Sequence, residues 1–485
     1  MPTEARARVR LGGLPRFALA LAYIALAATP LMVAAASGST SGQMFLELGT
    51  ALAFIAGAMA LLQFLSSGRF ERLTGRAGID RVMGFHRIAA IVLVTFAILH
   101  PLAYALPNLA ADPQLGYQQV TGMFASPRLR SGAIALAVLA LIVVLASVRH
   151  NRFVKYEYWR VTHGLAAMAA AGLILHHAIT AGSYSAATAA RLAWFGLALP
   201  AILALAQIYF LRPWRMWRDH WHVESVRPSG EGTIEMVLKG SPSSSFTFQG
   251  GQFLWMTIAP NRPPFHDHPF SIASSAAELP RLRLIIRRAG NCTNMFDTIA
   301  PGTAVAIDGP HGNFVLSELP ADTQTILMVA GGVGIAPLLG MLEDAAANGD
   351  TRTFRLLYGA RSARAFAAQD RITALTGRLN LAVSYCAEEP EDAPGILKGP
   401  LNVNQIRELA KTSDARRTAA FLCGPSAMME LAADTLLDMG LSPTAIHYER
   451  FDYAAGKSSI DRRRLAGVLG LFGGLLVTAL AFSLR

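Results

Sequence analysis

The sequence predicts an α-helical membrane bundle of six spans, then an antiparallel β-barrel domain, a doubly wound α/β domain and one extra C-terminal span. Three observations predict this order. The 485-residue chain is 53% apolar and only 15% charged, against roughly 25% charged residues in a typical soluble domain. Residues 14–211 and 465–483 are nearly free of acidic groups, whereas residues 221–455 have an ordinary soluble composition. Within the soluble part, short alternating strands give way to strand–helix alternation.

Seven apolar runs are long enough to cross a bilayer, which takes about 20 helical residues. They are residues 14–36, 44–66, 83–106, 131–148, 159–181, 192–211 and 465–483. The first run ends in Ala34-Ala35-Ala36-Ser37, a small-residue pattern that signal peptidase also reads. We expect this run to be retained as a span, because its apolar stretch is longer than the usual apolar region of a signal peptide.

The basic residues between these runs predict the orientation of the chain. Fifteen Arg and Lys residues flank one side of the predicted spans, and three flank the other: Arg6, Arg8, Arg10, Arg16, Arg69, Arg72, Arg76, Arg81, Arg149, Arg152, Lys155, Arg160, Arg212, Arg215 and Arg218 against Arg128, Arg130 and Arg191. The positive-inside rule then places the N-terminus and the soluble domains in the cytoplasm of a multi-pass cell (inner) membrane protein. The net charge is +11, but the Lys and Arg residues lie between apolar runs and are not clustered as in a nucleic-acid binder. Their position predicts an anionic membrane surface as the partner, and no nucleic acid.

Histidines stand inside two of the apolar runs, where ionisable residues are costly and usually functional. The third run holds His86 and His100, and the fifth holds His163, His176 and His177. An offset of fourteen residues is nearly four helical turns, so His86 and His100 project from similar faces about 21 Å apart. His163 and His177 repeat this offset, whereas His163 and His176 miss it by one residue.

Two helices that each carry two such histidines can hold two stacked haems between paired imidazoles. Neutral imidazole suits iron, and filling both axial positions favours electron transfer over binding of a diatomic ligand. Histidines hydrogen-bonded between helices, or a proton relay, are the alternative, but matched pairs on two runs favour two b-type haems. Ideal periodicity prefers His177 as the fourth ligand, and a kink at Gly172 would admit His176.

The number and spacing of the cysteines argue against an iron–sulfur centre and against a disulfide framework. The chain has three, Cys292, Cys386 and Cys423, and they are scattered. Without a cluster of four, the chain does not hold an iron–sulfur centre by itself, and the spacing does not predict a disulfide framework.

The soluble part reads as two domains. Four short strands separated by Gly, Pro and Ser predict a small antiparallel barrel: Thr233–Leu238, Gln252–Ile258, Leu282–Arg287 and Thr303–Ile307. After Ala321, four buried strands alternate with helical segments and predict a doubly wound parallel sheet: Thr325–Val329, Phe354–Tyr358, Leu381–Tyr385 and Ala419–Leu422.

A glycine-rich turn follows the first of these buried strands and opens a helix. It contains Gly331, Gly332, Gly334 and Pro337. Glycines let a backbone approach a pyrophosphate, and a helix N-terminus favours its negative charge. Such a turn alone is often only a tight loop, but the strand before it and the helix after it favour nucleotide binding.

Three motifs follow one another in the soluble part and together resemble those of a known family. They are His268-Pro269-Phe270-Ser271, the glycine-rich turn, and Cys423-Gly424-Pro425. Together they resemble the ferredoxin-reductase-type FAD/NAD(P)H module. Preceded by the histidine-bearing bundle, the chain resembles the ferric reductase and NADPH oxidase superfamily over roughly residues 80–455. The resemblance implies a transmembrane di-haem bundle at 1–218, an FAD-binding β-barrel at 219–320 and an NAD(P)H-binding α/β domain at 321–455. The last apolar run predicts an additional C-terminal transmembrane helix at 456–485.

The resemblance also implies roles for the matching residues. His268 to Ser271 would contact the flavin and its phosphate, and Gly290 to Thr293 would hold its pyrophosphate. The glycine-rich turn would cradle NAD(P)H, with Cys423 beside the nicotinamide ring, although a cysteine at a strand end is otherwise a small buried residue. Phe451 or Tyr453 would cover the flavin ring, and each is alternatively a core aromatic residue.

Two arginines bear on the choice of nucleotide. Arg361 and Arg364 follow the second strand of the α/β domain, where the adenosine ribose is expected. An acidic residue there would select NADH, whereas arginines pair with a 2′-phosphate. The sequence therefore favours NADPH over NADH.

The expected function is electron transfer from cytoplasmic NADPH, through FAD and two haems, to an acceptor on the outer side. The inner haem would use His86 and His163, and the outer haem His100 with His177 or His176. The acceptor would be a ferric chelate or O₂, with a slight preference for the chelate. The alternatives are a redox subunit that feeds a protein or quinone partner, and a non-catalytic membrane scaffold or sensor. The C-terminal span departs from the family plan, and would anchor the reductase or bind a membrane protein partner.

Overall fold

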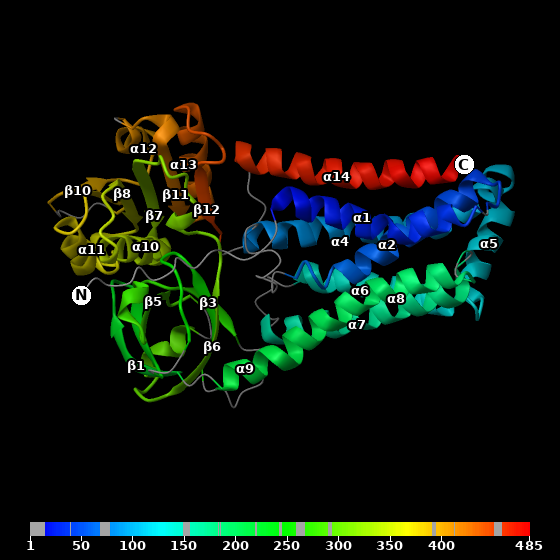
Figure 1. The fold of residues 1–485 in the computed structure, drawn as a ribbon, viewed down its shortest axis with the longest axis horizontal. Coiled ribbons are helices and arrows are strands. Elements are labelled where there is room, and N and C mark those ends of the chain that lie inside the picture. The colour runs from blue at the N-terminus through cyan, green and yellow to red at the C-terminus, as the bar shows by residue number, and fades with distance from the viewer. Residues whose placement is uncertain are drawn as a thin grey trace. The chain divides into compact units, whose positions relative to one another are not determined.

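The computed structural model describes residues 15–38, 40–67, 78–148, 156–182, 184, 186–218, 221–241, 245–258, 267–289, 293–389, 394–411, 413–450 and 458–485. The chain divides into two compact units. One contains the long apolar helices, and the other contains two β-sheets with their covering helices (Figure 1).

In the part of the helical unit that the structure describes there are eight helices: α1 (Arg16–Ala36), α2 (Met44–Leu62), α4 (Ile79–Ala111), α5 (Pro113–Ala125), α6 (Arg130–Val148), α7 (Tyr156–Ala181), α8 (Thr188–Ala206) and most of α14 (Ser459–Ser483). Within the described residues, seven helices are long and apolar enough to cross a membrane. They coincide with the seven apolar runs of the sequence, and α5 is the helix that does not qualify. A π-helical turn, Gln207–Leu211, and α9 (Arg212–Arg218) follow α8.

Helix α5 was not predicted from the sequence. Asp112 caps its N-terminus by accepting a hydrogen bond from the Gln114 N–H at 2.9 Å, and Pro113 stands at the first helical position, both common features of helix starts. Gln119 on α5 donates to the carbonyl oxygen of Tyr104 at 3.2 Å, which ties α5 to α4. In Figure 1, α5 runs across the end of the other helices of this unit.

The terminal helix α14 packs into the helical unit. The ring of Phe472 stacks on Phe85 with centroids 5.7 Å apart and meets Tyr23 edge to face at 6.2 Å. Near its end, the Arg485 guanidinium lies 3.7 Å from the carboxylate of Glu47 on α2. Glu47 is only 2% exposed, so the carboxylate of this ion pair is buried, whereas the arginine side chain is 23% exposed.

The antiparallel sheet has six strands in the order β4-β3-β6-β1-β2-β5. Their bounds are β1 Trp221–Pro228, β2 Thr233–Gly240, β3 Phe253–Ile258, β4 His268–Ser271, β5 Arg281–Arg287 and β6 Ala304–His311. An isolated antiparallel bridge between Ile272 and Leu284 links the two ends of the sheet. The four predicted strands are confirmed with small shifts of their ends, and β1 and β4 are additional.

The second sheet is parallel, with the order β10-β9-β8-β7-β11-β12. Its strands are β7 Thr325–Gly331, β8 Thr353–Ala360, β9 Leu381–Ala387, β10 Ile396–Lys398, β11 Thr418–Cys423 and β12 Ile446–Glu449. Helices α10 (Ile335–Ala347) and α11 (Gln369–Thr376) pack in one apolar core, and α12 (Val403–Ala410) and α13 (Ser426–Asp438) in another. Two cores around one parallel sheet confirm the doubly wound prediction.

The first turn of α14 is tied to the end of β12 by charged groups. Asp461 accepts hydrogen bonds from the Arg450 guanidinium at 2.8 Å, from the Ser458 hydroxyl at 2.6 Å and from the Tyr448 hydroxyl. Arg450 is only 5% exposed, and its guanidinium also lies 3.5 Å from Glu430. The compact unit that contains the sheets accordingly extends to Arg464.

Candidate functional site

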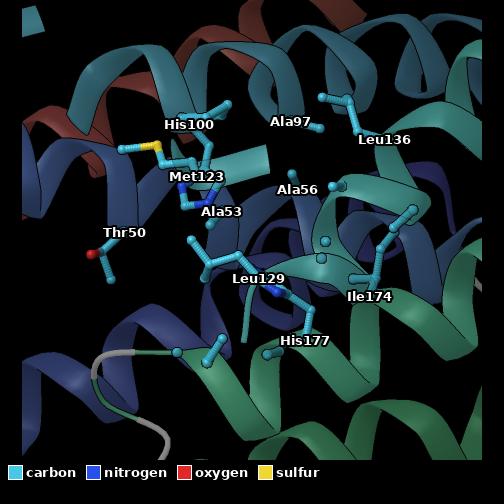
Figure 2. A pocket seen from close by; sticks show the side chains of 18 of the residues that line it. Thr50, Ala53, Ala56, Ala97, His100, Met123, Leu129, Leu136, Ile174 and His177 are labelled. Carbon is cyan, nitrogen blue, oxygen red and sulfur yellow. The ribbon is translucent and has the colours of Figure 1, made fainter. Parts of the chain in front are cut away.

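The helical unit encloses a cavity of about 400 Å³. Histidines from two helices line it, His100 on α4 and His177 on α7 (Figure 2). The rest of the wall is largely apolar, with Thr50, Tyr104 and Gln119 among its few polar members. Two imidazoles in an apolar cavity between helices form the donor set that a low-spin haem iron takes. Among the described residues, no group of three or more His, Cys, Asp or Glu is placed to hold a bare metal ion.

His100 is oriented by the backbone of α2. Its Nδ1 lies 2.8 Å from the carbonyl oxygen of Gly49. Because a carbonyl only accepts, Nδ1 carries the proton, and the lone pair of Nε2 is left for a metal. Gly49 allows this approach, since a Cβ there would lie 2.9 Å from the Tyr104 ring and 3.1 Å from the His100 carbonyl oxygen. The glycine therefore sets both the position and the tautomer of His100.

His177 is oriented by close packing. A Cβ at Gly132 on α6 would lie 2.8 Å from its ring, so a larger residue there would displace the imidazole. The Nδ1 atom of His177 is buried and has no hydrogen-bond partner among the described residues. The neighbouring His176 is exposed and does not line the cavity. The structure thus brings His177, and not His176, into the cavity with His100.

The other two histidines lie on the same two helices. The Ser66 hydroxyl is 3.2 Å from Nδ1 of His86, and the Gln63 side chain donates to the His86 carbonyl at 3.2 Å. The Trp159 ring stacks on His163 with centroids 5.2 Å apart. Each imidazole is thus held by a neighbour, as expected for a ligand whose orientation matters.

The predicted flavin segment, His268 to Ser271, forms β4 and pairs with β3. The Ser271 hydroxyl is buried without a hydrogen-bond partner among the described residues. An unpaired buried hydroxyl costs free energy, so its presence fits a site that receives a flavin phosphate. Pro269 is exposed, and Phe270 packs near Phe296 with ring centroids 5.8 Å apart.

Part of the predicted flavin site is not seen. Thr293 opens a short helical turn, and its hydroxyl accepts a hydrogen bond from the Ala289 N–H at 3.0 Å. Gly290, Phe451 and Tyr453 lie outside the described residues.

A charged cluster adjoins the flavin segment, and sequence reasoning did not find it. Arg212 on α9 is 8% exposed, pairs with Asp308 on β6 and lies 3.7 Å from Asp267, the residue before His268. His311 Nε2 is 2.7 Å from Asp308. Burial alone would raise the pKa of Asp308, but the His311 hydrogen bond and the Arg212 charge outweigh it and hold this pKa well below its ordinary value. These residues are too far apart in sequence to form a local motif.

The glycine-rich turn lies where the order of the parallel sheet reverses. Strands β8, β9 and β10 extend to one side of β7, and β11 and β12 to the other, and doubly wound proteins bind ligands at this switch point. A Cβ at Gly334 would lie 2.1 Å from the Cys423 carbonyl oxygen, and one at Gly331 would lie 2.6 Å from Pro425. Gly332 has a φ of +53°, which favours glycine. Pro337 is buried in the first turn of α10.

The Cys423 thiol stands at the centre of this edge. Cys423 is fully buried and pairs with Ala330 on β7 and with Glu449 on β12. Burial raises the pKa of the Cys423 thiol far above its ordinary value, and the Glu449 carboxylate raises it further, so the group stays a neutral thiol and is not a nucleophile. Gly424 follows with a φ of +156°. Glu449, 7% exposed, is a site residue that sequence reasoning missed.

The two arginines that the sequence predicts to select the nucleotide lie on the surface. Arg361 has a side chain 81% exposed, and its Nε is 2.6 Å from the Glu389 carboxylate. Arg364 is exposed, and its carbonyl oxygen accepts from the Glu231 N–H at 2.8 Å. Glu389 thus places an acidic group beside Arg361, a proximity that the linear sequence did not reveal.

Three protein families match successive parts of the chain. Residues 52–174 match the ferric reductase like transmembrane component, residues 220–314 an FAD-binding domain, and residues 328–434 the oxidoreductase NAD-binding domain.

Similar proteins match about half of the chain. The toluate 1,2-dioxygenase electron transfer component of Pseudomonas putida is 28% identical over 237 residues, which are 48% of this chain and 67% of that protein. The sulfhydrogenase 2 subunit gamma of Pyrococcus furiosus is 29% identical over 240 residues, 48% of this chain and 78% of that protein. Among solved structures, an Amycolatopsis cytochrome P450 reductase is 25% identical with a TM-score of 0.43, covering 48% of this chain and 69% of that one. In chain order, the three family matches show a membrane-linked oxidoreductase with FAD- and NAD-binding domains, and they support a fusion of the ferric reductase/NADPH oxidase type.

Proposed function

We propose that the chain transfers electrons from cytoplasmic NADPH, through FAD and two b-type haems, to an acceptor on the outer side of the cell (inner) membrane. The observation that carries the proposal is the shared apolar cavity of His100 and His177, on helices that also bear His86 and His163. When bound, FAD takes up a hydride and haem iron passes single electrons. The names of the two relatives above, an electron transfer component and a hydrogenase subunit, agree with a redox role.

The chain's own residues have separate tasks in this proposal. Gly331 and Gly334 let the backbone approach the nucleotide, and the neutral Cys423 thiol packs beside the nicotinamide ring. Ser271 donates to a flavin phosphate, while Gly290 and Phe451 stay predictions. The membrane part has six spans before the reductase and α14 as a seventh, and the antiparallel sheet forms a barrel closed near Ile272 and Leu284. The predicted boundaries at residues 218 and 320 belong to this proposal, and the contacts of Asp461 with Arg450 extend the nucleotide domain beyond the predicted boundary at residue 455.

The haem ligands follow from the cavity. We assign His100 and His177 to the outer haem and His86 and His163 to the inner haem. His176, being exposed, is left outside the ligand set. Gly49 fixes the tautomer of His100, and Gly132 makes room for the His177 ring.

Two acceptors are each favoured by one observation. Arg128 and Arg130 are exposed at the start of α6 and do not line the cavity, so they favour an anionic ferric chelate bound at the surface. The lining of the cavity contains no Asp, Glu, Lys or Arg among the described residues. This wall favours an uncharged acceptor, O₂, as the second candidate.

The decisive experiment uses the purified full-length protein in lipid nanodiscs. We expect a low-spin bis-imidazole signal, and reduction of both haems by NADPH in the absence of oxygen. Ferric citrate, O₂ and a quinone are then offered in turn, and Fe(II) and dismutase-sensitive superoxide are measured. A lack of low-spin haem would contradict the proposal. A lack of flavin fluorescence as well would favour the scaffold, and reducible haems without turnover on O₂ or ferric citrate would favour the redox subunit.

Nucleotide choice gives a separate prediction. Arg361→Ala is expected to lower kcat/KM for NADPH about tenfold and to leave that for NADH nearly unchanged, since only NADPH offers a 2′-phosphate for a charge-assisted hydrogen bond. Steady-state reduction of ferricyanide with each nucleotide measures both values. Arg378→Ala, which removes another exposed arginine of the same domain, is the control. Equal losses with NADPH and NADH would show that Arg361 does not read the phosphate.

A further inference from the structure

Helix α10, which begins directly after the glycine-rich turn, carries two adjacent carboxylates, Glu343 and Asp344. Asp344 contacts the domain that matches the FAD-binding family directly, and Glu343 is linked to that domain through Arg371 on α11. In Figure 1, α10 is the helix of the parallel-sheet domain that lies next to the antiparallel sheet. The function proposed above gives these contacts no role.

Asp344 is fully engaged by that domain. One carboxylate oxygen accepts from the Gly250 N–H at 2.9 Å, and the other from the Ser275 hydroxyl at 2.7 Å and the Ala276 N–H at 3.1 Å. The donors come from two segments, one before β3 and one after β4. The second follows the predicted flavin residues, because Ser275 is four positions beyond Ser271. A charged acceptor with three donors is a strong and directional connection.

Glu343 adds a second connection through Arg371 on α11. The Arg371 guanidinium donates to Glu343 at 2.7 Å, to Glu235 on β2 at 2.5 Å and to the carbonyl oxygen of Ala273. The side chains of all three charged residues are 12–18% exposed. A partly buried ion-pair network of this kind resists separation, because removing one partner leaves the others unpaired.

The backbones themselves touch beside these groups. A Cβ at Gly250 would lie 2.3 Å from the Gly340 carbonyl oxygen, and a Cβ at Gly340 would lie 2.4 Å from the Ile272 carbonyl oxygen. Since no side chain separates α10 from these segments, the contact has little room to slide. The network and the close packing act on the same face of α10.

We infer that Asp344 is a positioning residue for hydride transfer, which fixes the nucleotide-binding turn relative to the flavin segment. The inference rests on the NADPH-to-FAD step of the proposed function. In that step the C4–H bond of the dihydronicotinamide breaks and its hydrogen passes with both electrons to the flavin. NADPH becomes NADP⁺ and FAD gains two electrons. A misplacement of about 1 Å slows such a step about 100-fold.

The test is Asp344→Asn in the full-length, FAD-loaded protein. We expect the limiting rate of anaerobic flavin reduction by excess NADPH, followed by stopped flow, to fall between about 10- and 100-fold. The NADPH concentration at half-maximal rate and the FAD content should stay unchanged. Asp350→Asn is the matched control, because Asp350 receives its side-chain hydrogen bonds from Arg352 in the same domain. Ser275→Ala, which removes one donor, is a milder variant that should slow the step about threefold and combine non-additively with Asp344→Asn.

The outcomes separate positioning from stability. An unchanged limiting rate in both Asp344→Asn and Ser275→Ala would overturn the inference, including where the melting temperature falls. A raised half-saturating NADPH concentration with an unchanged limiting rate would also overturn it, since the effect would then be on binding. If the unaltered protein does not reduce its flavin with NADPH or NADH, the proposed function fails first, and the inference fails with it.

Discussion

His177→Ala is expected to leave the protein with one haem per chain and to stop electron flow from NADPH to the outer acceptor. His177 is one of the two imidazoles in the cavity, and its loss leaves His100 without an opposing ligand. A haem that loses one of its two axial imidazoles is held less firmly than before, and its iron has an open position for exogenous ligands. Haem content per FAD, measured as the pyridine haemochrome, and acceptor reduction by NADPH report the two effects.

The adjacent histidine supplies the control. His176→Ala should retain both haems and full electron flow, because His176 is exposed outside the cavity. If the His176→Ala protein loses a haem and the His177→Ala protein does not, the ligand assignment is wrong. Loss of no haem in either variant would remove the cavity from the electron path.

Gly334→Ala is expected to abolish reduction by NADPH while leaving the cofactors in place. The new Cβ would lie 2.1 Å from the Cys423 carbonyl oxygen and 2.9 Å from the Gly424 nitrogen. Both are backbone atoms, so the two turns of the nucleotide site must move apart. Because hydride transfer depends steeply on alignment, we expect flavin reduction to slow by about 100-fold or more.

Two measurements distinguish this effect from unfolding. Dithionite should still reduce both haems of the Gly334→Ala protein, and its FAD content should match that of the unaltered protein. Gly377→Ala is the control, since a Cβ there meets no atom within 4 Å and the residue has a φ of −85°. Normal NADPH oxidation by Gly334→Ala would show that the turn does not bind the nucleotide.

The spans were predictable because hydrocarbon requires long continuous apolar runs. The prediction for residues 83–106 was too short, since α4 runs from Ile79 to Ala111 and includes Pro101 and Pro107, residues that normally end helices. Helix α5 escaped prediction because Gln and Gly residues interrupt its apolar pattern. Asp112 caps the N-terminus of α5, and an aspartate is recognised as a helix cap only once the helix that follows it is known.

Some residues of the candidate site could be recognised from short sequence motifs, and others could not. The glycine-rich turn and Cys423 were found because each belongs to a short contiguous motif. Glu449 was not found, because the pairing of β12 with β11 brings it beside Cys423. The Arg212–Asp308 pair was not found, because it joins helix α9 to β6 across a long stretch of sequence. The choice between His176 and His177 depends on the rotation of one helix by about 100° per residue. Periodicity pointed to the member that the structure places in the cavity, but ligation itself stays a prediction.

The ion pair between Arg450 and Asp461 determines at which residue a water-soluble reductase fragment can end. Ending the fragment at residue 455 would delete Asp461. Among the described residues, the nearly buried guanidinium would then keep only the more distant Glu430 as an acidic partner. Losing one partner of such a pair costs about 3–5 kcal/mol, a large fraction of the stability of an ordinary domain. The opening turn of α14 is therefore a structural part of the nucleotide domain, and a fragment that ends after Arg464 keeps the arginine neutralised.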